Sequence, residues 1–230
     1  MTQYASSLVR DVLFGIRSLV FPSICVMCEE LPGVICKKCD ELWRSPATFT
    51  RFSLVPTSSV VAYSNQVSSV VLKAKEDRNR VARRLIAFSL YKSISLNIRQ
   101  NPMQPLLLLP IPSSRQAIRR RGESFLHPIL EEVIHIAQAH SLDWKWQEIL
   151  IHRQRVRDQA GLSSRERSLN VQGAFAVRDQ IYVDRPIIVV DDVITTGATL
   201  KNAILALNER KMTVLGAATA CASAHQLLIR

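Results

Sequence analysis

One stretch of fourteen residues decides the fold: Ile187-Ile188-Val189-Val190-Asp191-Asp192-Val193-Ile194-Thr195-Thr196-Gly197-Ala198-Thr199-Leu200. Its first four residues are β-branched and apolar, which is typical of a strand covered on both faces in the middle of a parallel sheet. Asp191 and Asp192 follow at the carboxyl end of this strand, where open α/β sheets bind their ligands. The stretch therefore predicts a parallel α/β sheet with a polar site at one edge.

The loop after the acidic pair has the size and the chemistry of a phosphate site. Thr195, Thr196 and Thr199 supply hydroxyl groups, and Gly197 allows a ligand to approach the backbone closely. We expect a helix over residues 198–207, so an anion in the loop would lie at its positive end. Each part also has an ordinary interpretation, since an Asp pair can cap a helix and Thr-Thr-Gly can be a turn. No Gly-Lys-Ser/Thr follows Gly197, so a Walker-type triphosphate loop is not expected.

The chain has 230 residues, of which 47% are hydrophobic, so it can bury one α/β core and still carry a small appendage. Its formal net charge of +11 predicts attraction to polyanions such as phosphorylated metabolites, nucleic acid or an anionic membrane. Part of this charge is clustered at Arg115, Arg119, Arg120 and Arg121, and again at Arg153, Arg155 and Arg157. A solvated basic face explains such clusters equally well.

The N-terminal residues have no stretch of the ~20 apolar residues that a membrane span requires. Apolar residues recur at helical spacing instead, namely Leu8, Val12, Ile16, Leu19 and Val20. This pattern predicts an amphipathic helix rather than a signal peptide. We therefore expect a cytoplasmic protein without a membrane span, in a compartment where structural disulfides are rare.

The cysteines fit that compartment. Cys25 and Cys28 form one Cys-x-x-Cys pair, and Cys36 and Cys39 form a second pair seven residues further on. Four thiolates at this spacing suit a structural, tetrahedral Zn²⁺ ion with no open coordination position. Redox-active dithiols are the alternative, but both pairs lie in a segment with Pro22, Pro32 and Gly33 rather than at a strand-to-helix junction.

The other apolar patterns place strands and helices in alternation. We expect strands over residues 54–63, 106–111, 149–152 and 213–220, and helices over residues 67–75, 81–98, 123–140 and 222–228. Such alternation is typical of a parallel sheet with helices on both faces. The sequence thus divides into an appendage over residues 1–45, with the helix and the cysteines, and an α/β domain over residues 46–230.

Two further polar segments are candidates for anion binding. Ser113, Ser114 and Arg115 lie beyond the carboxyl end of the strand over 106–111, although a plain turn also explains them. The segment 153–175 is long and polar, and its candidate residues are Arg153, Gln159, Arg167 and Asn170. Its guanidinium groups can fold over a diphosphate and exclude water, or the loop is disordered.

The stretch over 187–200 resembles the phosphoribosyl pyrophosphate (PRPP) motif of type I phosphoribosyltransferases. In that family the acidic pair holds the ribose hydroxyls and the following loop holds the 5′-phosphate. The resemblance implies that Asp191 and Asp192 contact the ribose. It also implies that Pro112, Ser113, Ser114 and Arg115 form the pyrophosphate loop. Arg119 and Arg121, from the arginine cluster that follows, are further candidates for this site. The phosphate loop would consist of Val193, Ile194, Thr195, Thr196, Gly197, Ala198 and Thr199.

Residues 20–220 also resemble the ComF family in the order of their motifs. These are the four-cysteine knuckles, a Pro-x-Pro segment with Arg-x-Arg-Gly at 119–122, the stretch that ends in Gly173-Ala174-Phe175, and the Asp-Asp-Val-Ile-Thr-Thr-Gly loop. The ComF family groups phosphoribosyltransferase-like proteins associated with bacterial competence, including GntX-type members. The resemblance implies a type I phosphoribosyltransferase-like α/β domain with an N-terminal zinc-knuckle module.

Two functions compete on this sequence. The first is Mg²⁺-dependent transfer of a phosphoribosyl group from PRPP to an acceptor that no motif specifies. The second is a non-catalytic factor that senses PRPP or binds single-stranded DNA, with competence or recombination proteins as partners. The net charge favours DNA, but Trp43, Trp144 and Trp146 are not interleaved with basic residues as in a stacking platform, so we expect them in the core.

Overall fold

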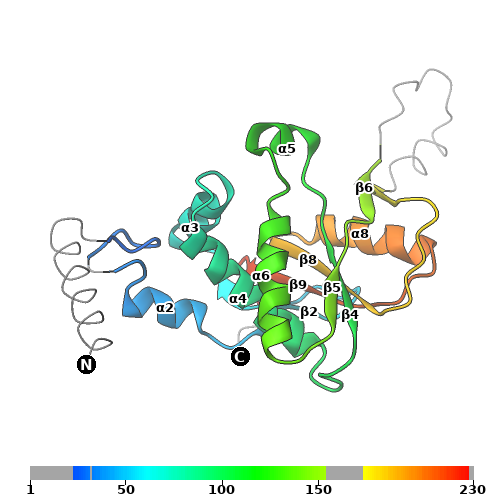
Figure 1. The fold of residues 1–230 in the computed structure, drawn as a ribbon, viewed down its shortest axis with the longest axis horizontal. Helices are drawn as coiled ribbons and strands as arrows, with labels where there is room; N and C mark the ends of the chain where they lie inside the picture. Colours follow the sequence, from blue (N-terminus) through cyan, green and yellow to red (C-terminus); the bar gives the residue numbers. More distant parts are fainter. Residues whose placement is uncertain (1–22, 32, 154–172, 228–230) are drawn as a thin grey trace, which may run out of the picture.

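The computed structural model describes residues 23–31, 33–153 and 173–227. The amphipathic helix expected between Leu8 and Val20 lies outside these residues. A sheet of seven strands runs through the centre of the described chain, and helices cover both of its faces (Figure 1). Among the described residues, no helix is both long and apolar enough to cross a membrane.

The sheet has the strand order β1-β2-β9-β8-β4-β5, and β3 also pairs with β9. Every pair in it is parallel except β1 with β2 at one edge. This arrangement confirms the expected α/β class, with a mostly parallel sheet. Its strands are β1 (Thr48–Phe49), β2 (Thr57–Ser59), β3 (Val61–Ala62), β4 (Leu106–Pro110), β5 (Trp144–Trp146), β8 (Ile187–Ile194) and β9 (Val214–Ala222).

The central strands bury side chains on both faces, as their apolar sequences predict. Leu106 and Leu108 of β4 belong to one core, which they share with the helices α3 (Asn65–Lys75), α4 (Arg80–Asn97) and α6 (Leu126–Ala139). Leu107 and Leu109 belong to the opposite core, with α8 (Ala198–Glu209). Because successive side chains of a strand point to opposite faces, this alternation explains why the helices form two layers.

The helices expected over 67–75 and 81–98 are confirmed as α3 and α4. Both begin at a side-chain cap, since Ser64 Oγ accepts from the N–H of Val67 and Asn79 Oδ1 accepts from the N–H of Ala82. The expectation of a single helix from residue 123 was incomplete, because a separate short helix α5 (Arg115–Arg121) precedes α6. No residue of α5 is buried, so its sequence lacks the regularly spaced apolar residues from which a helix is predicted.

Several strand boundaries also differ from expectation. The strand expected over 54–63 begins only after Pro56, which has no N–H for the ladder, and it is divided at Val60 into the two short strands β2 and β3. The helix expected over 222–228 is wrong: Ala222 still pairs with β3 and β8, and a bridge between Thr50 and Leu227 follows. The short strands β1, β5 and β7 (Phe175–Val177) were missed, whereas β6 (Leu150–His152) was expected.

The cysteine segment packs against the first helices of the sheet domain. Cys25, Cys39 and Trp43, the last two from the helix α2 (Lys37–Trp43), are buried in the same core as α3 and α4. Polar contacts join the two parts as well: Lys73 Nζ donates to the carbonyl of Val26 at 3.0 Å, and Ser69 Oγ donates to that of Met27 at 3.3 Å. The described part of residues 1–45 thus shares its core with the rest of the fold.

Candidate functional site

The acidic pair lies in β8, near the edge of the sheet where the carboxyl ends of the parallel strands meet. The strand continues past the pair because Val193 and Ile194 still pair with Cys221 and Ala222 of β9. Asp192 is 9% exposed, and Asp191 is partly buried. The backbone N–H of Asp192 donates a hydrogen bond of 2.9 Å to Asp191 Oδ1, which fixes the orientation of the first carboxylate.

A lysine that the sequence analysis did not identify contacts this pair. Lys75 Nζ, in the last turn of α3, lies 2.6 Å from Asp192 Oδ2, and 5.1 Å from the centre of the Phe125 ring. Only 27% of the lysine side chain and 12% of the aspartate side chain are exposed. Basic residues are common in the last turn of helices, so no sequence signal distinguishes Lys75 from other lysines.

The charges of this cluster do not cancel. Burial raises the pKa of Asp191 well above its usual range, the Asp192 carboxylate raises it further, and Lys75 acts in the opposite direction. Two carboxylates beside one ammonium group favour a ligand that brings hydroxyl donors or a cation. Carboxylate oxygens are also the ligands that Mg²⁺ prefers in proteins, so the pair fits either role.

The loop between β8 and α8 presents polar groups to solvent. Thr195, Thr196 and Thr199 are exposed at the start of α8, where the first N–H groups of a helix have no intrahelical partner. Ser223 holds the loop from the side, because its N–H donates to the carbonyl of Ile194 at 2.9 Å and its Oγ donates to that of Thr195 at 3.2 Å. The geometry is that of an anion site at a helix N-terminus.

Gly197 is required at the turn into α8. Its φ is +78°, a left-handed conformation that side chains rarely adopt. A Cβ atom at this position would lie 2.5 Å from Phe52 Cδ2, so no side chain fits without a shift of the ring. Neither Phe52 nor Ser223 was identified from the sequence, since both reach the loop from distant segments of the chain.

The loop after β4 lies next to the acidic pair, because β4 and β8 are neighbours and the N–H of Ile111 donates to the carbonyl of Val190. Ser113 Oγ lies 3.3 Å from Ser124 Oγ, and Ser114 Oγ caps α5 through the N–H of Ala117. Both serines thus have structural partners at the edge of the candidate site.

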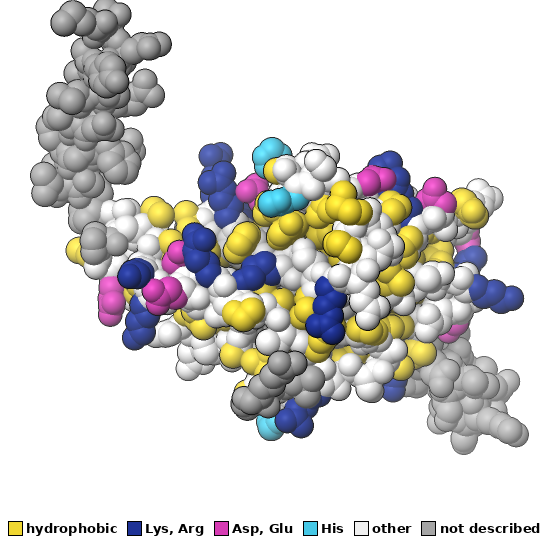
Figure 2. All heavy atoms as spheres, turned by 90° about the horizontal axis from the view of Figure 1, so that it is seen from below, with side chains coloured by type: hydrophobic (Ala, Val, Ile, Leu, Met, Phe, Trp, Pro, Cys, Tyr) yellow, Lys and Arg dark blue, Asp and Glu magenta, His cyan; other side chains and the backbone are white. Residues whose placement is uncertain are grey.

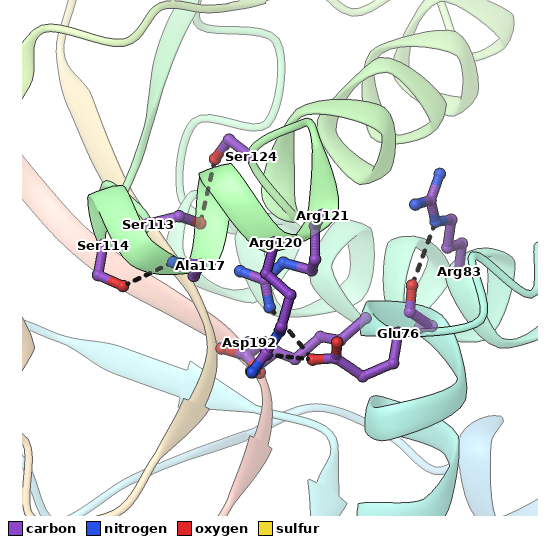
Figure 3. A network of polar contacts seen from close by, with 11 residues as sticks. Glu76, Arg83, Ser113, Ser114, Ala117, Arg120, Arg121, Ser124 and Asp192 are labelled. Carbon is purple, nitrogen blue, oxygen red and sulfur yellow. Dashed lines mark hydrogen bonds and ion pairs between the residues drawn. The ribbon is translucent and has the colours of Figure 1, made fainter.

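The arginines of α5 fall into two groups. Arg115 and Arg119 are exposed, and neither forms an ion pair within the described ranges. Arg120 and Arg121 instead reach Glu76, the C-cap residue of α3, at 2.7 and 3.6 Å (Figure 3). The helix α5 is therefore linked to Asp192 through the end of α3, because Glu76 directly follows Lys75, which contacts Asp192.

The long polar segment begins and ends in a pair of antiparallel strands. His152 of β6 is opposite Phe175 of β7, and His152 Nε2 lies 3.0 Å from the carbonyl oxygen of Pro112 in the loop after β4. Arg153 forms an ion pair of 3.2 Å with Glu209, at the far end of α8 from the phosphate loop. The other candidates, Gln159, Arg167 and Asn170, lie outside the described residues.

The four cysteines predicted to bind zinc come together. Their Sγ atoms all lie within 4.8 Å of one another, and Cys28 Sγ is 3.7 Å from Cys36 Sγ. In a tetrahedral site with Zn–S bonds of ~2.3 Å the sulfur atoms are ~3.8 Å apart, so the cluster fits Zn²⁺. Burial raises the pKa of Cys25, but the N–H groups of Cys28, Cys36 and Met27 outweigh it and lower this pKa to about 6. A thiol that ionises this readily is a good metal ligand.

The excess of basic residues does not form a single surface. On the face seen in Figure 2, Lys and Arg side chains stand apart from one another, with hydrophobic side chains between them. Many of the arginines elsewhere are engaged with carboxylates, including Arg83 with Glu123 at 2.7 Å. The net charge by itself thus marks no nucleic-acid groove on this face.

Comparison with known proteins identifies the C-terminal part of the chain. Residues 147–228 match the phosphoribosyl transferase domain family, and this region includes β8, the acidic pair and the phosphate loop. Among solved structures, an allosteric regulatory enzyme of purine biosynthesis aligns with 55% of this chain at 16% identity and a TM-score of 0.32. The alignment covers 24% of that enzyme, and a match at this TM-score supports no conclusion about function. No curated protein matches the chain.

The fold and the family match define a protein with a phosphoribosyltransferase domain in its C-terminal half. In front of that domain lies a cluster of four cysteines suited to a metal ion.

Proposed function

We propose that the chain binds PRPP with Mg²⁺ and transfers its phosphoribosyl group to an acceptor. The observation that carries the proposal is the position of Asp191 and Asp192 on the strand that leads directly into the Thr-Thr-Gly loop at the start of α8, whose two threonines are exposed. The match of residues 147–228 to phosphoribosyl transferase domains supports it independently.

Each part of the site has a role in this reaction. Asp191 and Asp192 hold the ribose hydroxyls, and the stretch from Val193 to Thr199 holds the 5′-phosphate. Because Val193 and Ile194 belong to β8, the hydroxyl and N–H groups for the phosphate come from Thr195 onward. Ser113, Ser114, Arg115, Arg119 and Arg121 are the proposed diphosphate ligands. Arg153, Gln159, Arg167 and Asn170 are proposed to cover the bound diphosphate.

Cleavage of the bond between C1′ and the diphosphate oxygen leaves positive charge on the ribose and negative charge on the departing pyrophosphate. In this proposal the acidic pair stabilises the ribose, and the arginines stabilise the leaving group. Bound Mg²⁺ would supply further charge stabilisation at the diphosphate. Lys75 keeps the two carboxylates together by partial neutralisation, since it lies 2.6 Å from Asp192.

The cysteine cluster leads us to propose a ComF-type protein. A structural zinc module in front of a phosphoribosyltransferase domain is the order of parts in that family, and the four Sγ atoms fit Zn²⁺. A role in DNA uptake is the second candidate function. It is favoured by Arg115 and Arg119, whose exposed side chains form no ion pair within the described part of the chain.

The deciding experiment measures release of pyrophosphate from PRPP and Mg²⁺ in the presence of a pool of candidate acceptors. Catalytic transfer predicts one pyrophosphate released for each molecule of phosphoribosylated acceptor formed. Tight PRPP binding without any release across acceptor pools would favour a PRPP sensor instead.

A further inference from the structure

The C-terminal end of α3 carries two adjacent, opposite charges, Lys75 in its last turn and Glu76 at its C-cap, which face two different parts of the proposed site. Lys75 contacts Asp192, the proposed ribose ligand, at 2.6 Å. Its neighbour Glu76 contacts Arg120 at 2.7 Å and Arg121 at 3.6 Å. In Figure 3, the two guanidinium groups reach from α5 toward Glu76, close to Asp192.

A single carboxylate oxygen serves both arginines. Glu76 Oε1 is the acceptor atom in each ion pair, and 38% of the Glu76 side chain is exposed. Arg121 is only 11% exposed, and its buried Nε has no hydrogen-bond partner among the described residues. The two guanidinium groups thus have more donors than Glu76 can satisfy.

The other arginines nearby are held separately. Arg83 lies 2.7 Å from Glu123 and Arg78 lies 3.7 Å from the same carboxylate. Arg78 also donates to the backbone carbonyl of Arg121, which fixes the end of α5. An anion could therefore bind Arg120 and Arg121 without breaking the ion pairs of Arg78 and Arg83 with Glu123.

We propose that Glu76 competes with the diphosphate of PRPP for Arg120 and Arg121, and so sets both the affinity and the selectivity of the site. The inference rests on the proposed PRPP function and adds two residues to it, Glu76 and Arg120. A diphosphate offers several oxygens where Glu76 offers one, and guanidinium groups bind phosphates in pairs of parallel hydrogen bonds. On binding, the arginines exchange Glu76 for the diphosphate, and Glu76 turns to solvent.

This competition makes the site selective for ligands with a diphosphate. Ribose 5-phosphate has only the 5′-phosphate, which the loop after β8 would bind, so it gains nothing from the release of Glu76. The Glu76 ion pairs thus oppose the binding of PRPP and of pyrophosphate but leave ribose 5-phosphate unaffected.

The test is calorimetry of Glu76→Gln with three ligands: PRPP with Mg²⁺, inorganic pyrophosphate with Mg²⁺, and ribose 5-phosphate. We expect PRPP and pyrophosphate to bind about three- to fivefold more tightly than to the wild type, because partly exposed ion pairs contribute less than about 1 kcal/mol. Ribose 5-phosphate should bind as before. Glu76→Asp, which keeps the charge on a shorter side chain, should give intermediate affinities.

Glu132→Gln is the matched control. It removes the same charge from a surface ion pair, in which Glu132 of α6 lies 3.4 Å from Arg84 of α4. It should leave all three affinities unchanged. Equal or weaker PRPP binding by Glu76→Gln, in a protein whose wild type binds PRPP, would overturn this inference alone. A gain for ribose 5-phosphate of the same size would overturn it as well, since it would indicate a general charge effect. Absence of PRPP binding in the wild type would overturn both this inference and the proposed function.

Discussion

The ring of Phe52 lies directly against Gly197, so that a Cβ atom on the glycine would be 2.5 Å from Phe52 Cδ2. Phe52 follows the edge strand β1, whereas Gly197 turns the chain from β8 into α8 with a φ of +78°. The segment that follows the edge strand thus packs against the loop that we assign to the 5′-phosphate. Backbone conformation and packing both require glycine at this position.

We expect Gly197→Ala to destabilise the fold by about 2–3 kcal/mol, since a left-handed alanine and a clash with a ring add together. Gly122→Ala is the matched control, because Gly122 has a φ of +79° but its Cβ would meet only the end of the Arg78 side chain at 3.4 Å. That variant should lose only about 1 kcal/mol. Urea denaturation measures both losses. Equal losses would show that Phe52 exerts no steric constraint.

The acidic pair is the next target. Asp191→Asn combined with Asp192→Asn should weaken binding of PRPP with Mg²⁺ by at least ~1.5 kcal/mol, because hydrogen bonds to charged groups contribute about that much. The control, Asp179→Asn with Asp184→Asn, removes two exposed carboxylates that pair with Arg210 and Arg185. Calorimetry on the folded variants decides the matter, and unchanged affinity in the first variant would remove the ribose-clamp assignment.

Asp191 should make the protein without bound ligand less stable at neutral pH. Because burial and the Asp192 charge raise the pKa of Asp191 in the folded state, the contribution of its protonated form is fully present below the unfolded pKa of about 3.9. That contribution is lost as pH rises through the higher folded pKa. Asp191→Asn should therefore be more stable than the wild type at pH 7–8 and lose this advantage toward acid pH.

Urea denaturation without PRPP or Mg²⁺, at several pH values between 4 and 8, measures this difference. A difference in unfolding free energy that is constant with pH would contradict the prediction, because it would indicate a change of packing instead. Asp179→Asn again serves as the control, since Asp179 is 88% exposed and its loss should not change the pH profile.

The strands and helices were predictable wherever the apolar residues within a single element followed the pattern of a buried strand or an amphipathic helix. The apolar run over residues 187–190 and the apolar patterns over 67–75 and 81–98 predicted β8, α3 and α4 from local sequence alone, although β8 continues past the acidic pair to Ile194. The cysteine spacing likewise placed four sulfur atoms together. Such patterns work because burial on two faces and metal coordination each constrain residues that are close in the sequence.

Contacts between distant segments were not predictable. Lys75 and Asp192 are separated by more than half of the chain, and nothing in either neighbourhood identifies the other. The helix α5 was missed because it buries no residue, although Ser114 and Gly122 mark its two ends. The helix expected over 222–228 failed because small apolar residues such as Ala222 suit a tightly packed strand as well as a helix.

For the cysteine cluster we expect one tightly held Zn²⁺ per chain, as measured by elemental analysis. Cys28→Ser with Cys36→Ser should lose it, whereas Cys221→Ala should keep it, because Cys221 is buried in β9 away from the cluster. A chelator should increase hydrogen exchange over residues 23–45 and spare the pairs between β4, β8 and β9. Metal-free native protein in which all four thiols react with an alkylating agent would contradict the site.

The last prediction separates DNA binding from PRPP binding. If the net charge of +11 serves a polyanion, single-stranded DNA should bind with little sequence preference and lose affinity steeply as salt rises, because phosphate contacts release counterions. Arg119→Ala with Arg120→Ala and Arg121→Ala should flatten the salt slope, but this variant also removes the ion pairs with Glu76. Arg115→Ala with Arg119→Ala is the cleaner variant, since both side chains are exposed and form no ion pair within the described residues.

A shift assay at ~50 mM salt, where counterion release favours binding most, detects the complex. If Arg115 and Arg119 contact DNA, their loss should reduce the salt slope by roughly one to two. PRPP with Mg²⁺ should then compete with DNA, because the same arginines are proposed to hold its diphosphate. Binding that survives in the variant and ignores PRPP would place DNA elsewhere on the protein. Absence of any shift would leave PRPP as the polyanion that these arginines serve.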